Sequence, residues 1–203
     1  MKERPILFSG PMVRAIVEGR KTQTRRIIRP QPTFEACTGD WLWKGMRYEW
    51  RSRCPYGQPS DRLWVRETWA QVCSNDGHPD CGEHLFSTEY RADSRNPYPG
   101  RWPPEMATDS ACGRWKSPIH MPRWASRINL DITRIRVQHL QAITALDCLA
   151  EGITDNDDPR IHHNIVALYH ALWDSLNAKR GFGWAANPWV WVIEFKRIRE
   201  SPA

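Results

Sequence analysis

The feature that most constrains the fold of this chain is an amphipathic segment that runs into a glycine and then into a basic stretch. Pro11 suits the first turn of a helix, and Gly19 suits the position just after its end. Between them, apolar side chains recur at helical spacing, at Met12, Val13, Ile16 and Val17. The pattern predicts a helix over residues 11–18, followed by a strand over residues 21–28.

The basic stretch that follows the helix, Gly-Arg-Lys-Thr-Gln-Thr-Arg-Arg over residues 19–26, contains no acidic residue. Five of the ten residues from Arg20 to Arg29 are Arg or Lys, so this part of the chain carries a positive field suited to phosphate or another anion. A strand with its charges in solvent is the other interpretation that a basic run leaves open. In an ideal strand Lys21 and Thr24 point to opposite faces. They converge only if residues 20–22 form a turn or a bulge, and we expect such an irregularity.

The overall charge of the chain allows an acidic partner without requiring one. Its 203 residues include 29 Lys and Arg against 23 Asp and Glu, a formal net charge of +6, which suits nucleic acid. We see neither a secretory apolar region at the start nor a run of roughly 20 apolar residues, so we expect a cytoplasmic protein with no membrane partner. The six cysteines are then expected to be free thiols.

Twelve tryptophans are present, and many of those in the first two thirds of the chain stand beside Arg or Pro. Such interleaving can stack bases and hold phosphates. It can also build a core in segments that are poor in aliphatic residues, and we favour this structural interpretation. The residues concerned are Trp41, Trp43, Trp50, Trp64, Trp69, Trp102 and Trp115.

Hydrophobic periodicity along the rest of the chain predicts an α+β protein with a single domain over residues 1–203. Strands are expected at residues 5–8, 62–66, 69–73, 85–91, 127–137 and 189–197. The series Thr-Ala-Leu-Asp from Thr144 is typical of a capping box that begins a short helix ending at Gly152. An apolar stripe from Ile165 to Leu176 predicts a longer, packed helix. Irregular, tryptophan-rich insertions are expected at about residues 30–60 and 74–123.

The helix followed by Gly-Arg-Lys-Thr-x-Thr-x-Arg resembles the signature of the ASCH domain, a member of the PUA-like β-barrel superfamily associated with RNA. Three further segments add to the resemblance: Pro-Ile-Leu-Phe-Ser-Gly-Pro from Pro5, Asp-Arg-Leu-Trp-Val-Arg-Glu-Thr-Trp from Asp61, and Trp-Val-Ile-Glu-Phe-Lys from Trp191. Together they look like the ASCH-like proteins encoded by phages and prophages. The resemblance implies a small mixed β-barrel with flanking helices, to which this chain adds its two insertions.

Residues 142–154 align without gaps with the segment of small bacterial ASCH amidohydrolases that contains their catalytic glutamate. The resemblance implies a site of Lys21, Thr24 and Glu151 that removes the acyl group from an acetylcytidine. Thr24 would be the nucleophile, Lys21 its base or electrostatic activator, and Glu151 a proton relay or substrate clamp. Glu151 in the last turn of a helix faces the negative end of the helix dipole, at a cost of about 0.3–1 kcal/mol, which a surface glutamate can also bear. No cofactor is expected, and the implied partner is a modified nucleoside, RNA or DNA.

Two other functions fit the same basic stretch. In a non-catalytic RNA- or DNA-binding module, Arg20, Arg25 and Arg26 would bind the anion together with Lys21, while Thr24 would donate hydrogen bonds. In a ribonuclease, the lysine would stabilise the charge of the phosphorane. Salt-sensitive binding without turnover distinguishes the first of these from a hydrolase, and cleavage of the polynucleotide distinguishes the second.

One group of potential zinc ligands stands apart from the basic stretch. Cys73, His78, Cys81 and His84 fall within twelve residues, with the spacing C-x4-H-x2-C-x2-H. This spacing is not that of a standard zinc finger or ribbon. We therefore favour a loop that holds these residue types by chance over a zinc site.

Overall fold

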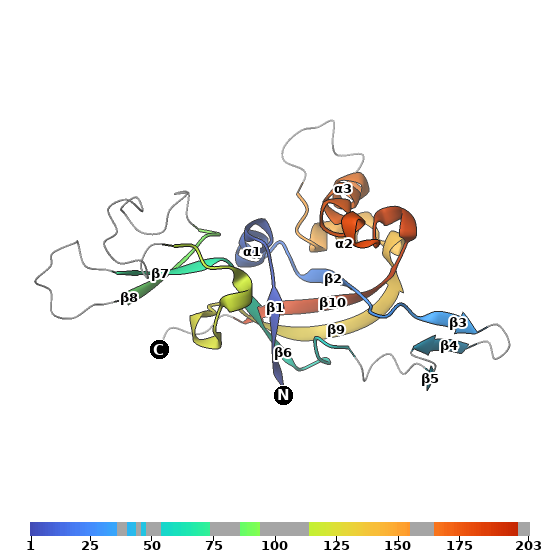
Figure 1. The fold of residues 1–203 in the computed structure, drawn as a ribbon, viewed down its shortest axis with the longest axis horizontal. Helices are drawn as coiled ribbons and strands as arrows, with labels where there is room; N and C mark the ends of the chain where they lie inside the picture. Colours follow the sequence, from blue (N-terminus) through green and yellow to red (C-terminus); the bar gives the residue numbers. More distant parts are fainter. Residues whose placement is uncertain are drawn as a thin grey trace, which may run out of the picture. The chain divides into compact units, whose positions relative to one another are not determined.

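The computed structural model describes residues 1–35, 40–43, 46–47, 54–73, 86–93, 114–154 and 165–198 (Figure 1). The chain divides into two compact units. Unit 1 comprises Met1–Arg4, Ala15–Leu63 and Leu130–Ala203, and unit 2 comprises Pro5–Arg14 and Trp64–Asn129. The single domain expected from the sequence stays a prediction.

The largest sheet has five strands, and its order differs from the order of the chain. It runs β1 (Glu3–Leu7), β6 (Arg62–Arg66), β9 (Asn129–His139), β10 (Trp189–Ile198) and β2 (Gln23–Ile27). All five strands were predicted, four from periodicity and β2 from its place after the first helix, and the α+β class is confirmed. β1 and β2 stand at opposite ends of this order, so the described strands do not form a closed barrel.

Two smaller sheets accompany the large one. β3 (Thr33–Glu35), β4 (Asp40–Trp43) and β5 (Met46–Arg47) form an antiparallel sheet within the first segment that we expected to be irregular. Prolines, glycines and charged residues interrupt the two-residue alternation there, which hid these short strands. In unit 2, β7 (Trp69–Cys73) pairs with β8 (Phe86–Tyr90). Both strands were predicted from the sequence, but their pairing with each other was not.

Three α-helices are described: α1 (Gly10–Val17), α2 (Ala145–Ala150) and α3 (Ile165–Asn177). The predicted capping box of α2 is confirmed, because the Asp147 amide donates to the Thr144 hydroxyl and the Thr144 amide donates to the Asp147 carboxylate, both at 3.1 Å. Tyr169 and Trp173 of α3 are buried, as expected, whereas Leu176 at its end is exposed. Among the described residues, no helix is long and apolar enough to cross a membrane.

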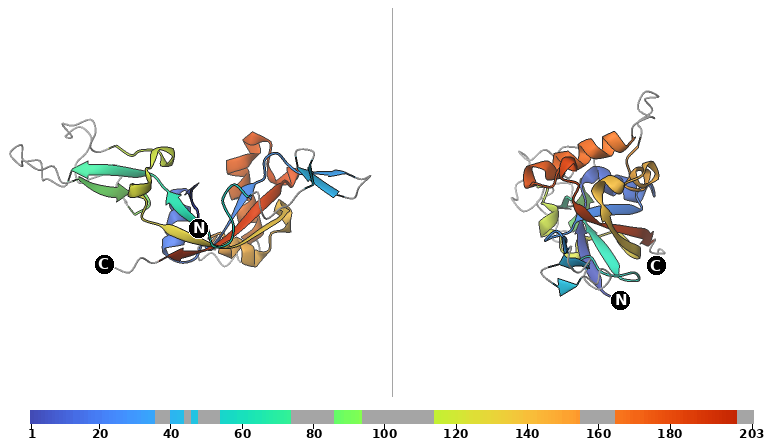
Figure 2. Two further views of the ribbon diagram at one scale, coloured as in Figure 1. Left: turned by 90° about the horizontal axis from the view of Figure 1, so that it is seen from below. Right: turned by 90° about the vertical axis from the view of Figure 1, so that its right-hand side faces the viewer.

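The core of unit 1 lies where α2 and α3 pack together with β10 (Figure 2). Its buried members come from all three elements and from the segment before α2: Leu140, Ile143, Cys148, Tyr169, Trp173, Val190 and Val192. Because α2 has only six residues, it depends on this packing for its stability. The core therefore fixes where the end of α2, and Glu151 after it, meets the sheet.

Unit 2 has a smaller core built around tryptophan, which confirms the structural interpretation for two of the tryptophans. Trp69 is buried against Met121 and Ala125, with Tyr90 packed at its edge, and Trp64 is also buried. The side chains of Trp41, Trp43, Trp50 and Trp102 lie outside the described residues. Cys54 and Cys148 are buried free thiols, as expected.

The capping box makes a testable contribution to stability. Thr144→Ala removes the acceptor of the Asp147 amide, and the free energy of unfolding is expected to fall by about 1 kcal/mol. Urea unfolding measures this. Ser175→Ala is the control, since this exposed hydroxyl only donates back to the Leu172 carbonyl within α3. Equal effects in the two variants would contradict a capping role for Thr144.

Candidate functional site

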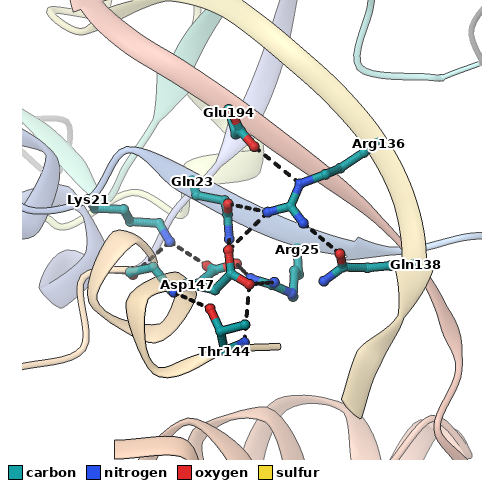
Figure 3. Close-up of polar contacts among 9 residues, drawn as sticks. Lys21, Gln23, Arg25, Arg136, Gln138, Thr144, Asp147 and Glu194 are labelled. Atoms are coloured by element: carbon teal, nitrogen blue, oxygen red, sulfur yellow. Dashed lines mark hydrogen bonds and ion pairs between the residues drawn. The ribbon is translucent and has the colours of Figure 1, made fainter. Parts of the chain in front are cut away.

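Lys21 and Glu151, 130 positions apart in the sequence, meet in the interior of unit 1. The Lys21 Nζ donates to the Glu151 Oε2 at 2.7 Å and to the Glu151 main-chain oxygen at 2.8 Å (Figure 3). The Lys21 side chain is 0% exposed and that of Glu151 is 5% exposed. Two of the three residues that the sequence resemblance placed in one site are therefore in direct contact.

The backbone before β2 is irregular, as expected from the sequence. Residues 20–22 lie between α1 and β2 in neither element, and the amides of Arg20 and Lys21 both donate to the Ala15 carbonyl at 2.9 Å. The Thr22 amide donates to the Ala150 carbonyl at 2.8 Å. Since Ala150 is the last residue of α2, this bond holds the start of β2 against the helix end that carries Glu151.

Arg25 binds the second oxygen of the same carboxylate. Its Nη1 lies 3.2 Å from the Glu151 Oε1, and its Nη2 lies 3.0 Å from the Asp147 Oδ2. The Arg25 side chain is 0% exposed. Each carboxylate oxygen of Glu151 therefore contacts a cation from the basic stretch. The Arg25 side chain lies in the interior of unit 1.

A second group of polar side chains extends this arrangement across the sheet. The Arg136 Nη2 lies 2.9 Å from the Asp147 Oδ1 and donates to the Gln23 Oε1 at 2.9 Å. Its Nε donates to the Glu194 Oε1 at 3.1 Å. We call the whole set the buried ionic network; it consists of Lys21, Gln23, Arg25, Arg136, Asp147, Glu151 and Glu194. It fastens α2 to β2, β9 and β10.

Burial changes the titration of the groups in this network. Desolvation lowers the pKa of Lys21 below its usual 10.5, helped by the charges of Arg26 and Arg25 and opposed by Glu151. Burial tends to raise the pKa of Asp147, but the Thr144 amide, Arg25 and Arg136 outweigh it and lower that pKa to about 2. Lys21 thus gives up its proton more readily than a lysine in water, as a general base must.

Thr24 is buried in β2, opposite Ile193 of β10. Its neighbours Gln23 and Arg25 both reach Asp147, so they share one face of the strand. Because side chains alternate along a strand, Thr24 points to the other face. The structure thus joins Lys21 to Glu151 and does not place Thr24 on the face of β2 that binds Asp147.

The remaining basic residues of the stretch occupy different surroundings. Arg20 is exposed, pairs with Glu18 and donates to the Gly152 carbonyl at 3.1 Å. Arg26 shares the Thr24 face of β2 and is partly buried. Of these three arginines, Arg20 is the one that an anion could reach from solvent. The anion-binding roles of Arg20, Arg25 and Arg26 stay predictions.

Several members of the network were not predicted from the sequence. The sequence pattern indicated only polar strand positions at Gln23, Arg136 and Glu194. It indicated only a helix-capping role for Asp147. The available signal was Asp147 itself, a carboxylate in the first turn of a short helix whose other end carries Glu151. Strand pairing decides which cation reaches it, and this pairing is not readable from local patterns.

Most of the candidate zinc ligands lie where the structure gives no description. His78, Cys81 and His84 lie outside the described residues, and only the backbone of Cys73 is described, at the end of β7. Among the residues that the structure covers, no group of three or more His, Cys, Asp or Glu side chains is arranged to hold a metal ion.

Comparison of the chain with protein-family models, with curated proteins and with solved structures found no match.

Gly152 tests how tightly the two halves of the site fit together. It has a φ of +84°, and a Cβ there would lie 2.8 Å from the Ala15 Cβ and 3.0 Å from the Lys21 Cβ. Gly181 has a φ of +79° with nothing within 4 Å, so it is a matched control. Gly181→Ala should lower the free energy of unfolding by about 1 kcal/mol, because its backbone is left-handed. Gly152→Ala should lower the free energy of unfolding by about 1–3 kcal/mol more than that, because the added methyl group overpacks the contact with Ala15 and Lys21.

Urea unfolding of the two glycine variants measures this difference. Equal losses of stability would show that residue 152 has room for a side chain, and that the contact between Gly152 and Lys21 is looser than the structure has it.

Proposed function

We propose that this protein is an ASCH-type hydrolase of PUA-like fold that acts on a modified nucleoside or nucleic acid, cleaving the amide bond of an acylated cytidine. The single observation that carries the proposal is the contact of the buried Lys21 Nζ with the Glu151 Oε2 at 2.7 Å. These are the lysine and the glutamate that the resemblance to ASCH amidohydrolases pairs.

The surroundings of Lys21 support a role as base. A lysine takes a proton from a nucleophile only in its neutral form, and desolvation by burial lowers the pKa of Lys21. Glu151 holds the ammonium in place through both its carboxylate and its main-chain oxygen. Because Arg25 shares that carboxylate, Glu151 remains paired when Lys21 becomes neutral.

In the proposed reaction the Thr24 hydroxyl attacks the acyl carbonyl carbon, and its proton passes to the Lys21 Nζ. The bond between this carbon and the cytosine amino nitrogen then breaks, and the proton is transferred to that nitrogen. Water hydrolyses the acyl ester left on Thr24. Since Thr24 and Arg25 point to opposite faces of β2, the step requires the irregular backbone of residues 20–22 to let the lysine amine reach Thr24. Because Lys21 is buried, the step also requires the acyl group to displace some of the side chains that shield Lys21 from solvent.

The polynucleotide-binding module finds less support in the same contacts. Its phosphate contacts include Arg25, whose guanidinium is buried and lies between Glu151 and Asp147. An arginine in this position would have to give up both carboxylates to bind a phosphate. Arg20, which is exposed, is free of that constraint.

The test is turnover of a panel of acylated cytidines and other modified nucleosides, followed by chromatography of the products. Lys21→Met should lower kcat by about 10²–10⁴-fold, because it keeps the length of the side chain and removes the base. Glu151→Gln should also lower it. Thr24→Val, which keeps the shape and loses the hydroxyl, should be inactive, whereas Thr24→Ser should retain activity.

Each variant needs a measurement of stability beside its turnover, because the buried ionic network also holds α2 to the sheet. A folded Lys21→Met variant with wild-type turnover would overturn the role of Lys21 as base. A folded wild type that deacylates no nucleoside would overturn the amidohydrolase. Salt-sensitive binding of RNA or DNA would then favour the binding module, and cleavage of RNA would favour the ribonuclease.

The pH dependence of kcat provides a separate prediction. Because the neutral amine is the active form, kcat should rise with pH and reach half of its maximum below the usual lysine value of 10.5. Profiles from about pH 6 to 10 measure this. Thr24→Ser should keep the rising limb, and Lys21→Met should lose it. An identical limb in Lys21→Met would assign the titration to another group.

A further inference from the structure

Two buried hydrogen-bond donors, one in the buried ionic network and one beside it, have no acceptor. They are the Arg25 Nε and the Gln138 Nε2, and no described residue accepts a hydrogen bond from either atom. Buried donors in folded proteins are usually paired, because an unpaired one is costly. Arg25 already binds Glu151 and Asp147 through its other two nitrogens. Its Nε and the Gln138 amide are therefore groups that the proposed reaction does not use.

The orientation of the Gln138 amide follows from its neighbour Arg136. The Arg136 Nη1 donates to the Gln138 Oε1 at 2.6 Å, and a guanidinium cannot accept a hydrogen bond. If the two ends of the amide were exchanged, donors of Gln138 and Arg136 would face each other. The amide oxygen therefore faces Arg136, and the NH₂ group is the end that has no acceptor.

The two donors lie on one face of the sheet, close to Asp147 (Figure 3). Arg136 and Gln138 are two positions apart in β9, so their side chains share a face. The two oxygens of Asp147 bind Arg136 and Arg25. Because Arg25 also binds Glu151, both donors adjoin the site of the proposed reaction.

The charges of the network select the chemistry of a ligand for these donors. The network balances three cations with three carboxylates: Lys21, Arg25 and Arg136 with Asp147, Glu151 and Glu194. An anion would add a buried charge without a partner, which is costly. A hydroxyl group or a water molecule would bring donors of its own, which these two nitrogens cannot accept. A carbonyl oxygen is neutral and only accepts, so it pairs both donors at no such cost.

We propose, on the basis of the hydrolase proposed above, that the Arg25 Nε and the Gln138 Nε2 bind a carbonyl oxygen of the substrate. An acylated cytidine has two such groups, one in the acyl group and one in the pyrimidine ring. At the acyl carbonyl, the donors stabilise the charge that develops on oxygen in the transition state. At the ring carbonyl, they hold the base. Both donors are shielded from solvent, so the substrate reaches them through the displacement that the reaction already requires at Lys21.

Gln138→Glu tests this site, because it keeps the acceptor for Arg136 and replaces the unpaired donor by an acceptor. Titration calorimetry with acetylcytidine and with cytidine, in a Lys21→Met background, measures binding without turnover. Gln138→Glu should weaken binding by about 5- to 150-fold, as for one buried polar group that loses its partner. Weaker binding of both ligands assigns the donors to the ring carbonyl, and weaker binding of acetylcytidine alone assigns them to the acyl carbonyl. Urea unfolding should show no loss of stability, because the new carboxylate accepts from Arg25 and Arg136.

Gln58→Glu is the matched control, since it adds the same charge at an exposed glutamine of unit 1. It should change neither affinity nor stability. Gln138→Met, which also lacks the donor, takes the place of Gln138→Glu if that variant does not fold.

Two results would overturn the proposal: a folded Gln138 variant that binds both ligands as tightly as its parent, or no binding of either ligand by the wild type and the Lys21→Met parent. Turnover by the wild type together with unchanged binding in the Gln138 variant would reject this site and leave the hydrolase standing. Cytidine binding that depends on Gln138, without turnover by the wild type, would reject the hydrolase and support the site.

Discussion

The position of α2 on the sheet depends on the carboxylate of Glu151, which binds Lys21 through one oxygen and Arg25 through the other. Charges buried to this extent are costly to leave without a partner. Removing one member of a buried pair typically costs about 3–5 kcal/mol, whereas the intact pair contributes little net stability. The main effect of the buried ionic network is therefore to specify which segments pack together. Its contribution to the net stability of the fold is small.

Asp147 connects the local structure of α2 with this tertiary contact. The same carboxylate closes the capping box with the Thr144 amide and receives Arg25 and Arg136 from the sheet. A change at Asp147 would thus alter the start of α2 and the surroundings of Arg25 together. Lys21 is both a member of the network and the candidate base. The contacts that would serve its chemistry are therefore the same contacts that hold α2 to the sheet.

The two units use cations and aromatic rings in different ways. In unit 1 the cations of the network are paired with carboxylates, with Lys21 and Arg25 buried and Arg136 partly buried. Arg25 also lies 6.0 Å from the centre of the buried Tyr169 ring. In unit 2, Arg66 and Arg123 lie over the buried Trp64 ring, while Trp124, the residue after Arg123, is exposed. Carboxylates contact the first group, whereas an aromatic ring lies under each of the second.

The sequence by itself determined the local elements: the helix after Pro11, the capping box at Thr144, and the strands in which two-residue alternation lasts. It also determined the candidate pair Lys21 and Glu151, through resemblance to known motifs. Only the tertiary structure decided that these two side chains touch, that Arg25 is internal, and that Trp69 is covered while Trp124 is exposed. The reason is physical: helix caps and alternation depend on neighbours in the chain, whereas ion pairing and burial depend on which distant strands lie side by side.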